Sequence, residues 1–501
     1  MRTRTFQAVG TIVVMAVALS ACSSGPDKGG GAAGGDGRGT PTAGHSALRR
    51  LPGSVYDVAL GPMTVAIDAA TAGRVVRGIS EDNAVFVLDG SDAEVRQLQV
   101  GKILLIEDVA LRKVVAVEPD GDNLAVGTVE ATLPEAIQNG TMKWNVPVRF
   151  GSPLARLRER SESPGSLLGL LAGGWLAPAR LNAAASNYEK SGKLSGWDYK
   201  ITSVPGPDRL DVNLYARKEV KGLSVELHGV GHLKDFETQA TVEIADSALK
   251  YFDYSNKNLN GEMSFEWTAA REGNAEPLKG PDAMFKFPAA FSMPLPIGGI
   301  PFVLEVTEAL LIEPAFGEKR EMGRGSFKVS YNGVSGFGIK GGEPTANAKL
   351  AATSSIGDVI SVSMVPSGVI IGVVAPKIEL KLGAANGLEW LKKIAPGTTA
   401  LTAARALEKT TILGKVNDAI SGIGTTLKKN EAAAHVSVTT MYVMASSGPL
   451  SIVPCQKTTL TVFGKAGAGA KIMGVSVGEK SVDVFKQEFK RLVPDRKACD
   501  F

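Results

Sequence analysis

The chain is poor in the residue types that most often build metal or nucleophilic sites, with three cysteines and four histidines in 501 residues. It also lacks an excess of one charge, because 55 basic and 51 acidic residues leave a net charge of +4. The two signs are interleaved, which gives little reason to expect nucleic-acid binding. Beyond residue 22, no apolar run reaches the ~20 residues of a spanning helix. We therefore expect most of the chain to be a water-soluble body.

The first 22 residues carry the most informative motif. Two arginines precede a short apolar stretch, which ends in Leu19-Ser20-Ala21-Cys22. A basic start, an apolar run and small residues before a cleavage point make up an export signal. With a cysteine directly after that point, the segment resembles the lipobox of bacterial lipoproteins. The resemblance implies that signal peptidase II removes residues 1–21 and that Cys22 becomes a diacylated, usually triacylated, first residue.

A lipid anchor on Cys22 implies a place in the cell envelope. Two or three acyl chains hold a protein stably where one holds it only marginally, at about 0.8 kcal/mol per buried CH₂. Ser23, in the sorting pattern of Gram-negative lipoproteins, implies the outer membrane. In a Gram-positive cell the anchor implies the outer face of the cytoplasmic membrane. The alternatives are a signal peptide without lipid or a short membrane helix.

The remaining cysteines, Cys455 and Cys499, predict one disulfide, because an even number outside the cytoplasm favours pairing. It would close a loop of about 45 residues and stabilise the fold by roughly 4 kcal/mol. Two separate buried thiols are the alternative. We expect no zinc site, since two cysteines without nearby histidines are a poor ligand set.

The length of the chain predicts two or three domains. The residue patterns predict that the fold is mainly β. Residues 22–47 are Gly-rich and almost free of large apolar side chains, which predicts a flexible tether. Residues 48–150 form short β-rich runs between turn signals such as Leu88-Asp89-Gly90, which indicates a small β-barrel-like module closed by a helical turn at 133–137. Residues 151–195, with an apolar patch at 167–176, are expected to be a linker with a short helix.

Residues 196–385 predict a large antiparallel sheet or sandwich. Apolar and polar residues alternate in 210–215, 223–228 and 263–267, so one face should be buried and the other wet. Residues 300–306 and 369–374 are apolar on both faces and should lie centrally, while the prolines from Pro288 to Pro301 indicate a crossing segment.

Two later segments show helical spacing. Residues 386–432 predict a helical insertion, because Ile412, Val416, Ile420, Ile423 and Leu427 recur every three or four residues. Residues 433–501 predict closing strands and a C-terminal helix, whose apolar stripe is Val482, Phe485, Phe489 and Leu492. The disulfide would pin this helix to the sheet.

The catalytic and metal motifs are incomplete. Ser476 in Gly474-Val-Ser-Val-Gly478 matches the nucleophile elbow of α/β-hydrolases, but no histidine follows residue 435 and the chain is not βαβ. His228 and His232 would lie about 13 Å apart along a strand, too far for one metal ion. We therefore predict no catalytic residue, no metal site and no cofactor.

The acidic and aromatic residues leave a binding role open. Glu266 and Glu272 near Trp267 suggest a glycosidase or glycan groove, although any β surface carries such pairs. Trp144, Trp197 and Trp267 are candidate ligand contacts or, alternatively, core residues.

Three functions remain in view. The favoured one is a lipid-anchored, non-enzymatic binding or scaffold protein, whose ligand is an envelope polysaccharide or protein. The second is a carrier of hydrophobic ligands in an apolar β cavity. The third is an envelope hydrolase, which a concave site with Ser476 or Glu266 beside a base would support.

Overall fold

The computed structural model describes the following residues: 54–80, 83–151, 156–159, 187–273, 278, 280–287, 289–315, 320–340, 343–362, 367–382, 401–402, 433–447, 455–468, 471–472, 475–476 and 480–500. Cys22 and the expected signal and tether lie outside them, as do the apolar patch at 167–176 and all of the expected helical insertion except Leu401 and Thr402. Within the described residues, no helix is long and apolar enough to cross a bilayer.

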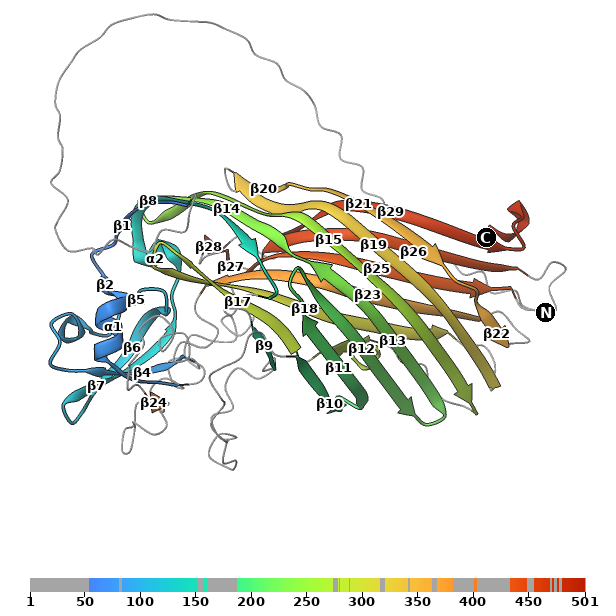
Figure 1. Ribbon diagram of the computed structural model, residues 1–501, viewed down its shortest axis with the longest axis horizontal. Coiled ribbons are helices and arrows are strands. Elements are labelled where there is room, and N and C mark those ends of the chain that lie inside the picture. Colours follow the sequence, from blue (N-terminus) through green and yellow to red (C-terminus); the bar gives the residue numbers. More distant parts are fainter. Residues whose placement is uncertain are drawn as a thin grey trace, which may run out of the picture. The chain divides into compact units, whose positions relative to one another are not determined.

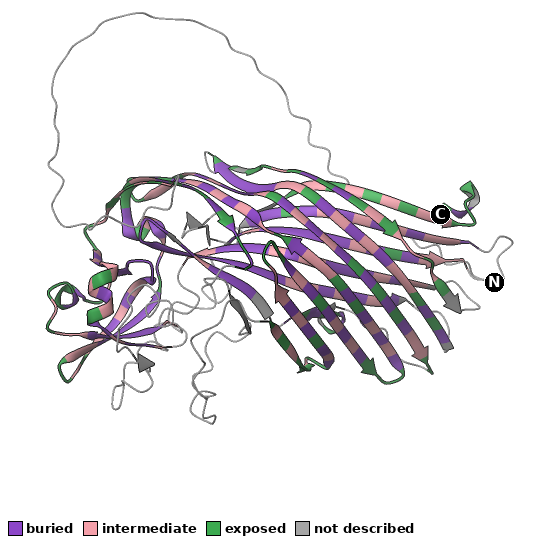
Figure 2. Ribbon diagram, viewed as in Figure 1, coloured by how far each residue is buried: buried purple, intermediate pink, exposed green. Residues whose placement is uncertain are grey.

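The largest element is a twelve-stranded antiparallel sheet (Figure 1). From one edge its strands are β1 (Val55–Leu60), β8 (Ile137–Val148), β14 (Phe236–Ala245), β15 (Ala248–Glu272), β13 (Leu223–Lys234), β12 (Arg209–Val220), β11 (Trp197–Pro205) and β10 (Tyr188–Leu194). β15 also pairs with β19 (Arg320–Lys340), which carries β20 (Glu343–Ala346), β21 (Lys349–Ile356) and β22 (Ile360–Val362). Buried and exposed residues alternate along β11 to β13, as the sequence predicted (Figure 2).

Tight turns set the register of this sheet. Lys221 and Gly222 join β12 to β13 with φ values of 44° and 82°, the positive pair that a type I′ turn needs. The turn fixes the pairs that follow it, from Val220 with Leu223 to Tyr215 with His228. Outward-facing side chains of adjacent strands are therefore brought side by side.

The second large sheet has eight strands and is also antiparallel. Its order is β29 (Lys480–Val493), β26 (Gln456–Ala468), β25 (Ala433–Ser446), β23 (Ser367–Leu382), β18 (Ile300–Ala315), β17 (Ala289–Ile297) and β9 (Arg156–Glu159), with β16 (Met284–Lys286) also on β18. The apolar segments expected to be central are confirmed as such, because β18 and β23 are paired on both sides.

The crossing segment expected from Pro288 to Pro301 is instead largely strand β17. Pro294 and Pro296 are tolerated because β9 pairs only with Ala289–Ser292 of β17, so that the prolines face a partner on the β18 side alone. A residue without an N–H fits such a half-paired position.

The C-terminal helix was a wrong prediction, because Lys480–Val493 is strand β29. The register of β29 against β26 shifts at Gly464, which pairs with Phe485 while Lys465 pairs with Asp483. Val484 is thus the extra residue of a bulge, and a bulge changes which side chains share a face. The shift places Val482 and Phe485, three residues apart in sequence, opposite Ala466 and Gly464, which are two apart, and this spacing resembled that of a helix.

A seven-stranded sheet forms the small module. Its order is β2 (Thr64–Ile67), β5 (Ile103–Ile106), β6 (Ala110–Asp120), β7 (Asn123–Glu130), β4 (Val85–Asp89), β3 (Val76–Ile79) and β24 (Leu401–Thr402). Its helices are α1 (Ala69–Val75), η1 (Val95–Gln97) and α2 (Leu133–Ala136), and α2 confirms the expected helical turn. β1 and β8, at the two ends of the expected 48–150 domain, pair with each other in the twelve-stranded sheet. The module is therefore an insertion between two neighbouring strands of that sheet.

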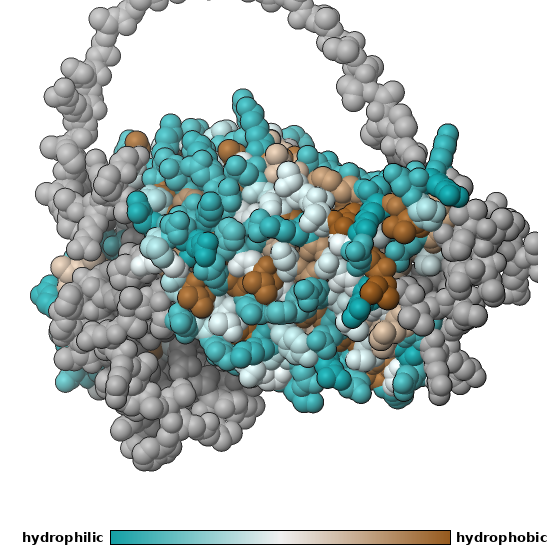
Figure 3. All heavy atoms as spheres, turned by 45° about the vertical axis from the view of Figure 1, so that its right-hand side comes forward, coloured by the Kyte–Doolittle hydropathy of each residue, from teal (hydrophilic) through white to brown (hydrophobic). Residues whose placement is uncertain are grey.

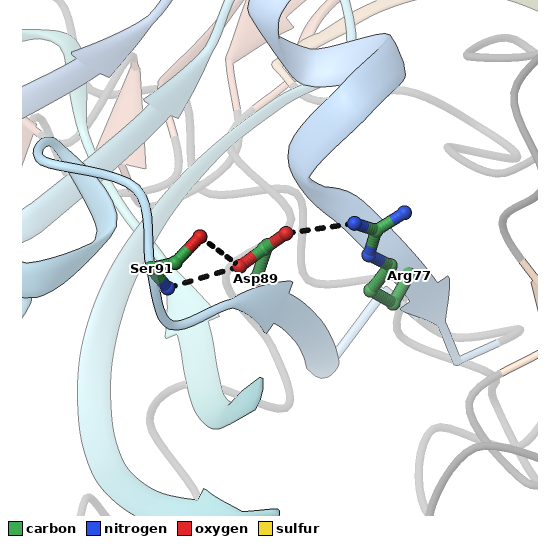
Figure 4. A network of polar contacts seen from close by, with 3 residues as sticks. All are labelled: Arg77, Asp89 and Ser91. Carbon is green, nitrogen blue, oxygen red and sulfur yellow. Dashed lines mark hydrogen bonds and ion pairs between the residues drawn. The ribbon is translucent and has the colours of Figure 1, made fainter. Parts of the chain in front are cut away.

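The turn predicted at Leu88-Asp89-Gly90 is tied by side chains (Figure 4). Asp89 accepts hydrogen bonds from the Ser91 N–H at 2.9 Å and hydroxyl at 2.7 Å, and it pairs with Arg77 at 2.7 Å. The bonds from Ser91 and then the bond from Arg77 lower the pKa of Asp89 to about 2. This carboxylate thus holds the end of β4 and serves a structural role.

The two large sheets share one hydrophobic core. Aromatic rings meet across it: Trp267 of β15 lies 5.9 Å from Tyr442 of β25, and Trp144 of β8 lies 5.1 Å from Phe302 of β18. The remaining elements are β27 (Lys471–Ile472), β28 (Val475–Ser476), η2 (Gly280–Ala283) and η3 (Lys497–Cys499). The prediction of a mainly β protein with large antiparallel sheets is confirmed.

Candidate functional site

The predicted disulfide is present. Cys455 and Cys499 are bonded, with Cα atoms 5.2 Å apart, and both residues are buried. The bond joins the start of β26 to η3, so it fixes the end of a strand rather than a helix.

The three candidate tryptophans lie in the core. Trp144, Trp197 and Trp267 are exposed by 3%, 0% and 2%. Trp267 points inward because successive side chains of a strand face opposite sides, whereas its neighbour Glu266 points to solvent. None of the three offers a ring to a ligand at the surface.

The serine motif lacks the surroundings of a nucleophile elbow. Val475–Ser476 is strand β28, which pairs with β27, and the next described segment is strand β29 rather than a helix. The side chain of Ser476 lies outside the described residues.

The histidines are not gathered at one place. His228 and His232 share the outer face of β13, while His435 lies on β25 of the other sheet, opposite Glu379. Burial, then the nearby Lys377, lowers the pKa of His435. Among the described residues, no group of three or more His, Cys, Asp or Glu is arranged to hold a metal ion.

Glu266 and Glu272 are not brought together, because six residues along a strand span about 20 Å. Glu266 instead lines a groove of about 470 Å³ on the outer face of the twelve-stranded sheet. Eight polar side chains from four adjacent strands line it: Lys200 and Thr202 of β11, Asn213 and Tyr215 of β12, Glu226 and His228 of β13, and Glu266 and Thr268 of β15.

Cross-strand register places these side chains in rows. One row runs Lys200, Tyr215, His228, Glu266, each residue directly opposite the next. Such partners have Cβ atoms about 4.5–5.5 Å apart, so each row can follow an extended ligand across the strands. His228 of this row is joined at 3.0 Å, between Nε2 and Oδ1, to Asn213, its diagonal neighbour on β12.

Tyr215 is the aromatic residue of the groove. Burial raises the pKa of its phenol, and the negative charge of Glu226 and a hydrogen bond to Glu226 act in the same direction. The ring is half-buried rather than enclosed, so it can still contact a ligand. Figure 3 shows a surface of mostly hydrophilic side chains with apolar ones between them.

A second, interior space lies between the sheets. Leu210, Val212, Met263 and Val306 line it together with Glu308 and Tyr331, and its volume is about 20 Å³. That is room for about one water molecule. Burial raises the pKa of Glu308 to about 8.

Comparison with known families adds two matches. Residues 50–139 match a model described as a domain of unknown function, DUF8403, and residues 190–388 match a second such domain, DUF8402. No curated protein and no solved structure matches the chain. All eight groove residues fall within the range of the second match.

Proposed function

We propose that this protein is a lipid-anchored, non-enzymatic component of a bacterial cell envelope that binds a glycan strand in the groove of β11, β12, β13 and β15. The carrying observation is the convergence of eight polar side chains from four strands in one concave surface. The lipobox at Leu19–Cys22 supports the envelope location.

The chemistry of the groove favours a glycan over a folded protein partner. Hydroxyl groups of Thr202, Tyr215 and Thr268 and the amide of Asn213 can exchange hydrogen bonds with sugar hydroxyls. Protein interfaces instead centre on buried aromatic and arginine anchors, and the groove has a single aromatic residue.

Exposure favours binding over hydrolysis. Glu266 and His228 do lie together in a concave site, which is the arrangement that would support an envelope hydrolase. Both side chains are exposed. Electrostatic catalysis gains most in a water-excluded, preorganised site, and an open sheet face does not provide one.

The interior space favours glycan binding over carriage of an apolar ligand. Large side chains such as Phe302 and Tyr442 are buried in the described core, and the space that described residues line between the sheets measures about 20 Å³, far below the ~300 Å³ of ordinary ligand pockets.

The proposal is tested by co-sedimentation of the mature protein with purified peptidoglycan sacculi and with extracted envelope polysaccharide. Tyr215→Ala should weaken binding at least about fivefold, a loss of roughly 1 kcal/mol typical of one hydrogen bond. Tyr251→Ala is the matched control, since Tyr251 is a half-buried tyrosine on the outer face of β15 outside the groove. Equal binding by both variants, or no binding by the wild type, would refute the proposal.

A further inference from the structure

The groove carries more negative than positive charge. Its ionised side chains are the carboxylates of Glu226 and Glu266 and the ammonium group of Lys200. Lys200 is already matched, because its Nζ lies 2.7 Å from Glu189 of β10. Arg217, opposite Glu226 in register, is likewise paired with Glu219 at 2.9 Å. Arg217 also contacts Tyr215 and lies near Glu226, so among the described residues Glu266 is the groove carboxylate without a cationic partner.

The two groove carboxylates are diagonal neighbours. Glu226 pairs with Thr268 and His228 pairs with Glu266, so Glu226 and Glu266 lie two positions apart on adjacent strands. Diagonal neighbours are about 7–8 Å apart, close enough for one small group to lie between them. Glu226 is bonded to Tyr215, but within the described part of the chain Glu266 has no ion pair or hydrogen bond.

A single ammonium group fits this arrangement better than the other common cations. It has three donors that can be divided among two carboxylates and a phenol, whereas a guanidinium group prefers a planar, bidentate match to one carboxylate. A divalent metal would want six or more oxygen ligands, and the described residues hold no group of three metal-binding side chains. The ring of Tyr215, in the adjacent strand, can add a cation–π contact.

We propose that the groove selects glycans that carry a free amino group, and that Glu226 and Glu266 bind the ammonium form of an unacetylated amino sugar. This inference rests on the proposed function, since it names the ligand class of the same site. Hydroxyl and amide side chains around the two carboxylates would contact the sugar ring on either side of the amine.

The test compares two tetrasaccharides with the same backbone, the β-1,4 tetramer of glucosamine and its fully N-acetylated form. Titration calorimetry near pH 6 and low ionic strength keeps the free amines charged and the screening weak. The glucosamine tetramer should bind the mature protein about tenfold more tightly than the acetylated one, the size of one charge-assisted hydrogen bond. Glu266→Gln should abolish this preference, while Glu243→Gln, on the outer face of β14, should keep it.

The outcomes separate the two levels of the argument. Equal affinity for both tetramers would overturn the inference and leave glycan binding in place. A preference for the glucosamine form that persists in both glutamine variants would also overturn it, because the selectivity would lie elsewhere. Binding of neither tetramer, with sacculi still retained by the wild type but not by Tyr215→Ala, would place the ligand in another class of glycan and overturn the inference alone.

Discussion

At the scale of single residues, Glu308 is held in an unfavourable place. It lies in β18 at an irregularity in the pairing with β23, between Thr307 and Ala309, and it lines the small cavity between the sheets beside Tyr331. Moving an ionised carboxylate from water into such a place is costly, so the group retains its proton. Burial accordingly raises the pKa of Glu308 from 4.5 to about 8.

The pH dependence of stability should report this residue. Between these two pKa values the folded chain keeps a proton on Glu308 that the unfolded chain releases. The contribution of this proton to the free energy of unfolding is therefore fully present below about pH 4.5 and is lost as the pH rises to about 8. At 1.36 kcal/mol per pKa unit, the loss is on the order of a few kcal/mol. Glu308→Gln should therefore be more stable than the wild type above pH 8 and show a flatter decline, measured by urea unfolding at several pH values.

Glu243→Gln serves as the control for that measurement, because Glu243 is exposed on β14. It should unfold with the pH profile of the wild type. A Glu308→Gln profile that parallels the wild-type profile across the whole range would contradict the protonated state of this half-buried carboxyl group.

Residue placement also shows what sequence alone can reach. Alternation was enough to place Glu226 and His228 on the solvent side of β13 and Tyr215 on the solvent side of β12. The turn at Lys221-Gly222 was a further usable signal, because a two-residue turn there pairs Tyr215 with His228. The buried positions of Trp144 and Trp267 follow from the same parity, since each lies between outward-facing polar neighbours.

At the scale of elements, β29 depends on one neighbouring strand and on side-chain contacts. It is an edge strand that pairs only with β26. Side-chain contacts add to this pairing. Arg491 donates a hydrogen bond at 2.9 Å to the carbonyl of Ile356, the last residue of β21, and it pairs with Asp358, which follows β21. The disulfide then fixes the chain just after the strand.

Loss of the disulfide should therefore loosen β29 first. The double variant Cys455→Ala, Cys499→Ala should lose about 2–4 kcal/mol of unfolding free energy, since the bond closes a loop of 44 residues in sequence separation. Hydrogen exchange should accelerate in β29 and in its partner β26 before it does so in β15. Reduced wild-type protein should behave like the variant, and unchanged exchange in both would contradict this role.

Pairing between elements marks the limit of prediction from this sequence. β13 pairs with β15 and not with β14, which follows it in the chain, and β15 also pairs with β19 about 50–90 residues later. Local patterns contain no information about such long-range pairs. The pairing of β12 with β13 across their hairpin could therefore be predicted from the sequence. The position of Glu266 beside His228 could not, because it depends on the pairing of β13 with β15. The bulge at Val484 hid a strand for a related reason, because it depends on the partner strand.

At the scale of the whole molecule, anchoring decides where the groove can act. Our proposal attaches the chain to a membrane through Cys22 and places the β body in contact with envelope polymers. Cys22→Ser should leave an unprocessed precursor and abolish labelling by an alkyne-tagged fatty acid in a bacterial host. Cys455→Ala should remain lipidated, which separates acylation from folding effects. Normal processing and labelling of the Cys22→Ser protein would remove the anchor from the account.

The measurement that tests the central claim most directly is carboxyl footprinting of the mature protein with and without saturating envelope glycan. A carbodiimide couples glycine ethyl ester to accessible carboxylates, and mass spectrometry reports each site. The account predicts that the ligand protects Glu226 and Glu266 while Glu243, exposed elsewhere on the same face, keeps its reactivity. Unchanged labelling of Glu226 and Glu266 under conditions where the glycan is bound would show that the groove is not its site.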